Sequence, residues 1–293
     1  MATTFEVVIA GETAEYARQA AAAAFGEISR VEQVLSRFLE HSDVSRINRL
    51  APGESTRIGV EAFECLELAA TIHADTAGAF DATVGPLVTL WQGARARGDT
   101  PSEEALAEAR ARVGMDLLEL DAREYRVRVK VQGVQVDLGG IGKGYALDLA
   151  SEMLRDWSIE AALVSAGEST VLALGLPEGE RGWSVGVGGV ANKPPEKSCL
   201  CNRALSGSGI AIKGPHIIDP RTGKPAQGNT AAWAACPSAA AADALSTAFM
   251  VMSSAEVEQY CRERPDTAAM LAVVQDGREK LLRFGDWGAG NAA

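Results

Sequence analysis

The spacing of hydrophobic positions predicts several amphipathic helices. Ile28, Val31, Leu35 and Phe38 recur at steps of three and four residues, which places them on one face of a helix. The alanine-rich stretch before them favours the same structure, so we predict a helix over about residues 12–38. Further helices, the second and fourth of them with serine N-caps, are expected at residues 60–76, 102–112, 142–157 and 238–252, with one more near the C-terminus.

Runs rich in β-branched and aromatic residues predict strands, most of them in the middle of the chain. They are expected at residues 4–9, 117–120, 126–131, 134–138, 161–165, 170–174, 183–187, 203–205, 216–218 and 230–236, with further strands near the C-terminus. Residues 41–53 and 78–90 combine glycine and proline with polar or apolar neighbours, so we expect loops there, the second of them buried. Strands in the middle and helices toward both ends predict the α+β fold class.

The composition indicates a folded protein and excludes several classes. Of the 293 residues, 47% are hydrophobic and 23% are charged, which rules out disorder, collagen and coiled coil. The length is compatible with one or two domains. The formal net charge of −11 argues against a nucleic-acid binder and against attraction to anionic lipid. A phosphate-bearing ligand would therefore need a cation or main-chain dipoles beside it.

The sequence shows none of the usual signals for export or membrane insertion. No apolar run approaches the ~18 residues of a membrane span, and no basic segment followed by a long apolar stretch opens the chain. The five cysteines are scattered, and Cys199-x-Cys201 has no second pair at zinc spacing. We therefore expect a cytoplasmic protein for the sequence as written, or a periplasmic one if a leader has been removed.

Two segments have the composition of phosphate and metal sites. In residues 137–145 a predicted strand is followed by glycines, Lys143 and a predicted helix, a context in which main-chain N–H groups and a cation can hold an anion. It is not a Walker A loop, because Gly144 follows the lysine, and a tight strand–helix turn is the alternative. Asp243 and Thr247 are four residues apart with Ser246 beside them, so they share a helix face that can bind Mg²⁺ or can be an ordinary polar helix start.

Three other segments are weaker candidates. His216 begins an apolar segment that ends in a polar turn, and it can act as an acid, a base or a structural hydrogen-bond donor. Asp81 is a carboxylate in an apolar, glycine-flanked loop, where it would bind either main-chain groups or a ligand. Gly186-x-Gly188 is followed by no helical pattern, so we interpret it as a strand and turn without a dinucleotide.

Taken together, six stretches resemble the ApbE family, the FAD:protein FMN transferases. In the family's order, they are MATTF (1–5), LSRFLEHSDVSRIN (35–48), GAFDATVGPLVTLW (78–91), VDLGGIGKGYALD (136–148), HIIDPRTGKP (216–225) and ADALSTAF (242–249). The resemblance implies a single α+β domain over residues 1–284, related to the T-fold, with a mixed or antiparallel sheet, flanking helices and a flexible tail at 285–293. It also implies Mg²⁺-dependent transfer of the FMN moiety of FAD to a Thr or Ser hydroxyl of an acceptor protein, with AMP leaving.

The resemblance further assigns residues to these roles. The expected FAD contacts are Met1, Phe38, Ala79, Phe80, Asp81, Asp137, Lys143 and Ile217. The expected metal ligands are Asp243, Ser246, Thr247 and a main-chain oxygen of Gly140. His216 is our candidate for assisting the attacking hydroxyl, and Asp243 is taken as catalytic through the metal. The expected partners are FAD and an acceptor protein, such as a subunit of a redox complex, and neither nucleic acid nor a membrane span is expected.

The chain also departs from the family's pattern. Residues 165–169 read SAGES where the family usually has an Asn-x-Gly-Gly-Asp type of turn, so Glu168 and Ser169 replace a glycine and a carboxylate. Three hypotheses follow. The chain is an active transferase, a non-catalytic FAD-binding carrier or sensor, or an FAD pyrophosphatase that releases AMP and FMN. We further expect Asp137, Gly140, Lys143, Asp243 and Thr247 to meet in one cleft if the transferase hypothesis is right.

Overall fold

A computed structural model describes residues 3–188, 195–211, 214, 216–275 and 278–287. Residue contacts divide the chain into two compact units. The first unit comprises residues 1–30, 141–211 and 228–293, and the second comprises residues 31–140 and 212–227. Met1, an expected FAD contact, lies outside the described residues, as does most of the expected tail at 285–293.

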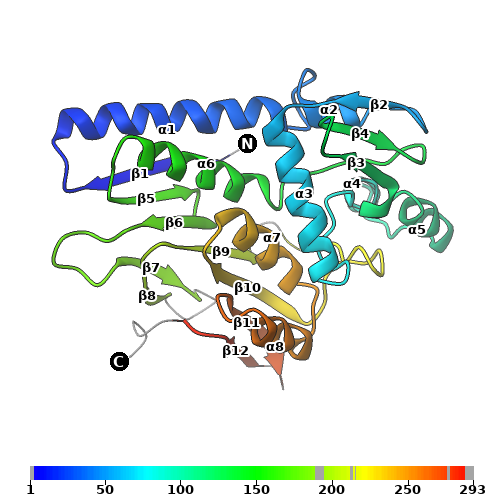
Figure 1. Ribbon diagram of the computed structural model, residues 1–293. Helices are drawn as coiled ribbons and strands as arrows, with labels where there is room; N and C mark the ends of the chain where they lie inside the picture. The colour runs from blue at the N-terminus through cyan, green and yellow to red at the C-terminus, as the bar shows by residue number, and fades with distance from the viewer. Residues whose placement is uncertain (1–2, 189–194, 212–213, 215, 276–277, 288–293) are drawn as a thin grey trace. The chain divides into compact units, whose positions relative to one another are not determined.

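The first unit is built on one antiparallel sheet (Figure 1). Its seven strands lie in the order β1-β5-β6-β9-β10-β11-β12. They are β1 (Phe5–Ala10), β5 (Ala161–Ala166), β6 (Thr170–Leu174), β9 (Arg203–Gly209), β10 (Asn229–Cys236), β11 (Ala268–Gln275) and β12 (Arg278–Phe284). All six pairings in this sheet are antiparallel, so the sheet is not mixed.

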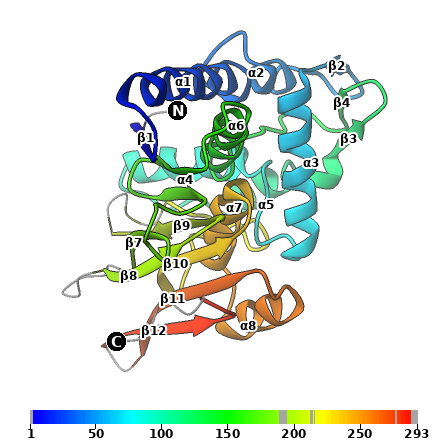
Figure 2. The same cartoon turned by 60° about the vertical axis from the view of Figure 1, so that its left-hand side comes forward.

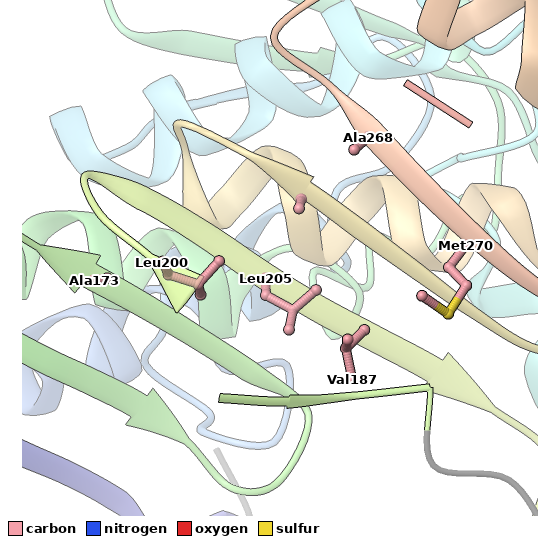
Figure 3. Packing of buried hydrophobic residues seen from close by; sticks show 7 residues of the cluster. Ala173, Val187, Leu200, Leu205, Ala268 and Met270 are labelled. Atoms are coloured by element: carbon pink, nitrogen blue, oxygen red, sulfur yellow. The ribbon is translucent and has the colours of Figure 1, made fainter. Parts of the chain in front are cut away.

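Two helices of the first unit, α6 (Gly142–Asp156) and α7 (Ala239–Phe249), pack on one face of this sheet and on each other (Figure 2). A two-stranded hairpin, β7 (Trp183–Val187) with β8 (Glu196–Leu200), packs on the opposite face. The apolar cluster between the hairpin and the sheet includes Val187 from the hairpin and Leu205 and Met270 from the sheet (Figure 3). Helix α8 (Ser254–Glu263) lies against β11 and β12. Each face of the sheet therefore has its own cover, as alternating side chains of a strand require.

Helix α1 (Ala14–Leu35) begins in the first unit and ends in the second. The second unit contains α2 (Asp43–Ile47), α3 (Val60–Asp75), α4 (Gly85–Ala96), α5 (Glu103–Arg110), the short 3₁₀ helix η1 (Met115–Leu117), β2 (Ser55–Arg57), β3 (Leu118–Asp121) and β4 (Arg126–Val129). The three strands form a small sheet in the order β2-β4-β3. The Trp91 indole donates to the Gly223 carbonyl at 2.8 Å, and Arg110 donates to the Arg221 carbonyl at 2.8 Å. These bonds fasten residues 216–225 to α4 and α5.

The prediction of an α+β fold is confirmed, and each of the five helices with predicted bounds is present. The helix predicted over residues 12–38 ends at Leu35, so Phe38 lies beyond it and is exposed instead of belonging to its apolar face. The helix predicted over residues 238–252 ends at Phe249. Ser102 and Ser238 cap α5 and α7 as predicted, because each side-chain oxygen accepts a main-chain N–H of the first turn. No helix in the described ranges is long and apolar enough to cross a membrane. The sequence did not indicate the short strands β2 and β8.

Two predicted loops proved partly helical. Residues 41–53 contain α2, whose N-cap Ser42 accepts the Ser45 N–H at 3.0 Å. Residues 78–90 are irregular only up to the start of α4 at Gly85, with Pro86 in the first turn. A proline is tolerated there because the first N–H groups of a helix have no partner within it.

Two predicted strands were wrong. Residues 134–138 form only an isolated bridge from Gln135 to Val84. The Asn48 side chain forms hydrogen bonds with both main-chain groups of Val136: it accepts the Val136 N–H at 2.6 Å and donates to the Val136 carbonyl at 2.9 Å. These groups are therefore not available to a neighbouring strand. Residues 216–218 likewise form only one bridge, from Ile218 to Pro225, and a proline cannot donate to a ladder.

Candidate functional site

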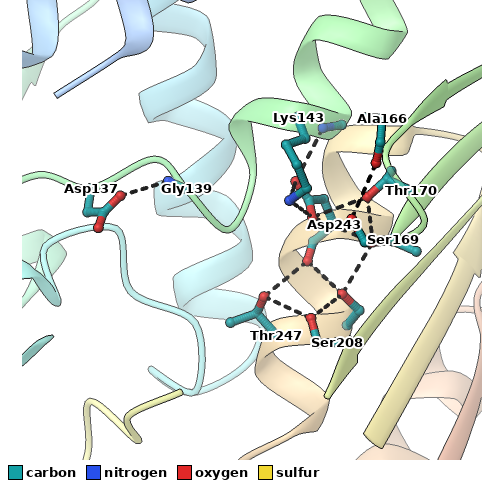
Figure 4. A network of polar contacts seen from close by, with 12 residues as sticks. Asp137, Gly139, Lys143, Ala166, Ser169, Thr170, Ser208, Asp243 and Thr247 are labelled. Carbon is teal, nitrogen blue, oxygen red and sulfur yellow. Dashed lines mark hydrogen bonds and ion pairs between the residues drawn. The ribbon is translucent and has the colours of Figure 1, made fainter. Parts of the chain in front are cut away.

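The first unit holds a buried carboxylate, Asp243, on α7 (Figure 4). The residue is 3% exposed. The Lys143 ammonium lies 2.8 and 3.1 Å from its two oxygens, and the Gly144 N–H donates to Oδ2 at 3.2 Å. A buried carboxylate is retained when it is paired and hydrogen-bonded, and here the first turn of α6 supplies both partners.

A chain of hydroxyl groups extends from Asp243 along strand β9 (Figure 4). Thr170 Oγ1 and Ser206 Oγ lie 2.9 Å apart, and both are within 3.5 Å of Asp243 Oδ1. Ser208 Oγ lies 2.9 Å from Ser246 Oγ and 3.4 Å from Thr247 Oγ1. The hydroxyls of Ser246 and Thr247 also donate to the main-chain oxygen of Asp243, at 2.9 and 3.3 Å. The expected helix face of Asp243, Ser246 and Thr247 is therefore lined by oxygen atoms.

Two contacts between α6 and α7 hold this arrangement in place. The Asp148 carboxylate accepts the N–H groups of Ala239 and Ala240 at 2.7 and 2.9 Å and the Ser238 hydroxyl at 2.8 Å. Burial raises the pKa of Asp148, and these three hydrogen bonds act in the opposite direction. Gly144 lies so close to α7 that a Cβ there would overlap the Ala239 carbonyl. The position of Asp243 beside Lys143 therefore depends on a carboxylate cap and a glycine contact.

The residues expected to bind Mg²⁺ fit that ion in their chemistry. Mg²⁺ prefers oxygen ligands, takes one or two carboxylates and shares its remaining positions with water and substrate phosphates. In the part of the chain that the structure describes, no three His, Cys, Asp or Glu side chains gather as a metal site. Asp243 is thus a single carboxylate among hydroxyls, which suits an ion bound together with a phosphate ligand. Gly140, the expected main-chain ligand, is in the second unit, at the end of residues 31–140.

In the second unit, Phe38 and Asp137 are brought together through one arginine. Phe38 is 81% exposed, and the Arg37 guanidinium lies 4.7 Å from the centre of its ring. Arg37 Nε is 3.3 Å from Asp137 Oδ2, and Asp137 Oδ1 accepts the Gly139 N–H at 2.9 Å. An exposed aromatic ring beside a fixed cation is a surface on which a planar ring can stack.

Asp81 is held within its own loop. It is 5% exposed, and its Oδ1 accepts the N–H and the hydroxyl of Thr83 at 2.7 and 2.6 Å. His73 Nδ1 lies 3.1 Å from Asp81 Oδ2 and 3.0 Å from the Phe80 carbonyl. The bond to Asp81 raises the pKa of His73, more than burial lowers it. Ala79 and Phe80 are also buried, so this segment offers main-chain groups rather than free side chains.

His216 and Ile217 follow one another but differ in exposure. Ile217 is 8% exposed, and its carbonyl accepts the Ala226 N–H at 2.9 Å. His216 is exposed, and its Nδ1 lies 2.8 Å from the Gly214 carbonyl. A carbonyl only accepts, so Nδ1 carries the proton and Nε2 is left as the basic nitrogen.

Several residues around these positions were not predicted. Arg37 and Asp148 lie inside two of the six stretches that resemble the family, but the resemblance assigns neither of them a role. Nothing in the sequence links the hydroxyls of Thr170, Ser206 and Ser208 to α7. The two serines alternate along β9, so they share one face of the sheet. That alternation was the only available signal.

The fold and these residues define a class of protein: an α+β protein in which a lysine, a buried carboxylate and a cluster of hydroxyl groups lie together beside the central sheet. The model of the ApbE family matches residues 1–271. The chain therefore belongs to the ApbE family.

Known relatives agree with this membership. The FAD:protein FMN transferase of Klebsiella pneumoniae (strain 342) is 27% identical, over 94% of this chain and 83% of its own. That of Treponema pallidum (strain Nichols) is 28% identical, over 84% and 75%. Among solved structures, the ApbE protein of Thermotoga maritima MSB8 has a TM-score of 0.84 at 29% identity, covering 96% of this chain and 94% of its own. The apo flavinyl transferase ApbE of Pseudomonas stutzeri has a TM-score of 0.81 at 25% identity, covering 96% and 95%.

Proposed function

We propose that this chain transfers the FMN moiety of FAD to a Thr or Ser hydroxyl of an acceptor protein, in a reaction that requires Mg²⁺ and releases AMP. The observation that carries the proposal is the buried Asp243 carboxylate, paired with Lys143 and flanked by Ser246 and Thr247. The activity for which the relatives are named, FAD:protein FMN transferase, supports it. A protein that uses covalently bound FMN, such as a subunit of a redox complex, fits the role of acceptor.

The chemistry is a phosphoryl transfer. The acceptor oxygen forms a bond to the phosphorus of the FMN half, and the bond from that phosphorus to the oxygen bridging to AMP breaks. AMP leaves with the bridging oxygen, and the acceptor hydroxyl loses its proton. His216 is our candidate to take that proton at Nε2, because Nδ1 donates to the Gly214 carbonyl.

Positioning and charge account for most catalysis in such transfers. Asp243, Ser246 and Thr247 would hold Mg²⁺, which when bound neutralises charge on the pyrophosphate. Lys143 supplies a further positive charge to the pyrophosphate from the first turn of α6. Its ammonium also holds the Asp243 carboxylate in position.

The remaining assigned residues bind the FAD molecule. Phe38 provides the exposed ring for stacking, and Asp137 is fixed by Arg37 and the Gly139 N–H. The main chain of residues 79–81, fixed by the internal bonds of Asp81, and the Ile217 segment provide polar main-chain groups.

The experiment that tests the proposal compares Asp243→Asn with wild type in the presence of FAD, Mg²⁺ and a flavin-acceptor domain. Mass spectrometry reads AMP, free FMN and the FMN adduct. We expect an Mg²⁺-dependent adduct with wild type and a loss of at least about 100-fold in Asp243→Asn, because Asp243 is the one carboxylate among the expected Mg²⁺ ligands and a neutral amide would hold the ion far less well. Asp121→Asn, on the exposed end of β3, is the matched control and should behave as wild type.

The other outcomes separate the alternative functions. AMP and free FMN formed without an adduct would identify an FAD pyrophosphatase. FAD bound but unchanged would identify a carrier or sensor. An adduct that forms equally well with Asp243→Asn would contradict the site assignment.

A further inference from the structure

Strand β9 extends beyond its neighbour β6. The pairing of the two strands ends at Thr170 with Ser206, and one further bond joins the Gly207 N–H to the Ser169 carbonyl at 2.7 Å. On the other side, β9 stays paired with β10 as far as Gly209 with Ala231. Within the described ranges, no strand pairs with Ser208 or Gly209 on the β6 side.

The main-chain groups of this free edge point outward. The Gly207 N–H points toward β6 and the Ile210 N–H toward β10, where it donates to Thr230. Because N–H directions alternate along a strand, the Gly209 N–H points to the same side as that of Gly207. An unpaired edge of this kind is a template for one more extended strand.

The two faces of this edge differ in chemistry. The Ser208 side chain points to the α7 face, where it lies within 3.4 Å of the Ser246 and Thr247 hydroxyls. Gly207 points to the opposite face, where a Cβ would stand 2.7 Å from two atoms of the Trp233 indole. The glycine thus allows the indole to lie directly against the strand.

A pocket of about 260 Å³ opens on the Trp233 face. Its lining combines apolar side chains with the turn between β5 and β6: Gly167, Glu168, Ser169, Thr170, Val171, Val185, Gly186, Leu205, Gly207 and Trp233. Glu168, which is exposed, is the acidic residue among those that line the pocket. An aliphatic stem that ends in a positive charge complements such a surface, because the stem packs on the indole and the cation pairs with Glu168.

We propose that the acceptor protein binds as an extended segment that pairs with the free edge of β9 at Ser208 and Gly209. This inference rests on the proposed transferase function. Successive side chains of an extended segment point to opposite faces. The acceptor's Thr or Ser that lies opposite Ser208 therefore points to the α7 face, on which Asp243 lies. The side chain next to it in the acceptor segment points to the opposite face, into the pocket beside Trp233. Edge pairing supplies affinity and the pocket supplies specificity, here for Lys or Arg next to the modified residue.

The test uses a library of synthetic nine-residue peptides with a central Thr, incubated with FAD and Mg²⁺ and analysed by mass spectrometry. With wild type we expect enrichment of Lys and Arg beside the labelled Thr. With Glu168→Lys we expect the ratio of Lys to Glu at that position to fall by at least about tenfold. Labelling without a flanking preference, or a preference that Glu168→Lys leaves unchanged, would overturn the assignment of the pocket.

A matched pair of variants at Gly209 tests whether the acceptor segment pairs with the edge of β9. Gly209→Pro removes the outward N–H, whereas Gly209→Ala keeps it, and a Cβ there meets nothing closer than 3.4 Å. We expect peptide labelling by Gly209→Pro to be at least about tenfold below that of Gly209→Ala. A scan of N-methylated peptides leaves the protein untouched and should show losses at every second residue. Equal labelling by the two variants, or losses without this alternation, would overturn the pairing.

Release of AMP and free FMN from FAD, and the FMN adduct on a folded acceptor domain, are measured in the same samples. A folded acceptor that is labelled while no peptide is labelled would overturn docking as an extended segment and leave the transferase function standing. If no adduct forms on any acceptor, the proposed function fails first, and the docking proposal falls with it.

Discussion

The close contact between α6 and α7 at Gly144 allows the effect of adding one methyl group, in Gly144→Ala, on the stability of the protein to be predicted. A Cβ at this position would stand 2.6 Å from the Ala240 nitrogen and would overlap the Ala239 carbonyl. Ordinary van der Waals contact begins at about 3.4 Å, so relieving the overlap with the Ala239 carbonyl would require the helices to separate by more than 1 Å. The Asp148 cap and the Lys143–Asp243 pair join the same two helices and oppose that movement.

The magnitude follows from two opposing effects. Replacing glycine by alanine inside a helix stabilises it by about 0.5–1 kcal/mol. Overpacking a close contact between elements costs about 1–3 kcal/mol, and more when main-chain atoms are involved. We expect Gly144→Ala to lower the free energy of unfolding by about 2 kcal/mol, which corresponds to roughly 3 °C in Tm for a chain of this size.

The matched control is Gly26→Ala in α1. Gly26 is exposed, and a Cβ there meets nothing within 4 Å. The same substitution should therefore raise the free energy of unfolding by about 0.5–1 kcal/mol. Denaturant unfolding followed by circular dichroism measures both variants. The reasoning is refuted if Gly144→Ala is as stable as wild type, or if the two variants shift stability in the same direction.

Two further predictions concern the second unit. The raised pKa of His73 means that its pair with Asp81 stabilises the fold fully below the unfolded pKa of about 6.5 and loses this contribution as pH rises through the folded value. The Tm difference between wild type and His73→Gln should therefore be largest below pH 6.5 and shrink in alkaline buffer; a difference that grows with pH would contradict this. Phe38→Ala should weaken FAD binding by about 2–10-fold through lost stacking and change stability by less than about 0.5 kcal/mol. Fluorescence titration with flavin checks it, with the exposed Phe25→Ala on α1 as the control that should leave the affinity unchanged.

Much of the local structure could be predicted because its causes are local. Helix α1 follows from side chains three and four residues apart, and the starts of α5 and α7 follow from the serine N-caps Ser102 and Ser238. Each of these interactions joins residues within one helical turn. The same holds for the helix face shared by Asp243, Ser246 and Thr247, which needed only the helical spacing to be predicted.

The sequence could not show where an asparagine side chain would take the hydrogen bonds that a partner strand would otherwise form. Residues 134–138 have the composition of a strand, but both main-chain groups of Val136 are hydrogen-bonded to the side chain of Asn48, 88 positions away in the sequence. The isolated bridge at Ile218 and Pro225 has a related cause, since strand pairing needs a partner with free donors and acceptors. Strand propensity describes only one of the two partners.

The sequence by itself determined the family motifs, the helices with their caps and the identity of the chemical groups: Lys143, Asp243 and the two hydroxyls on α7. The tertiary structure alone decided what those groups contact. Thr170, Ser206 and Ser208 reach Asp243 and α7 only because the register of β6 and β9 places them on the helix-covered face. Register depends on pairing between distant segments and on burial of one face of a sheet, and neither is written in the local sequence of the strands.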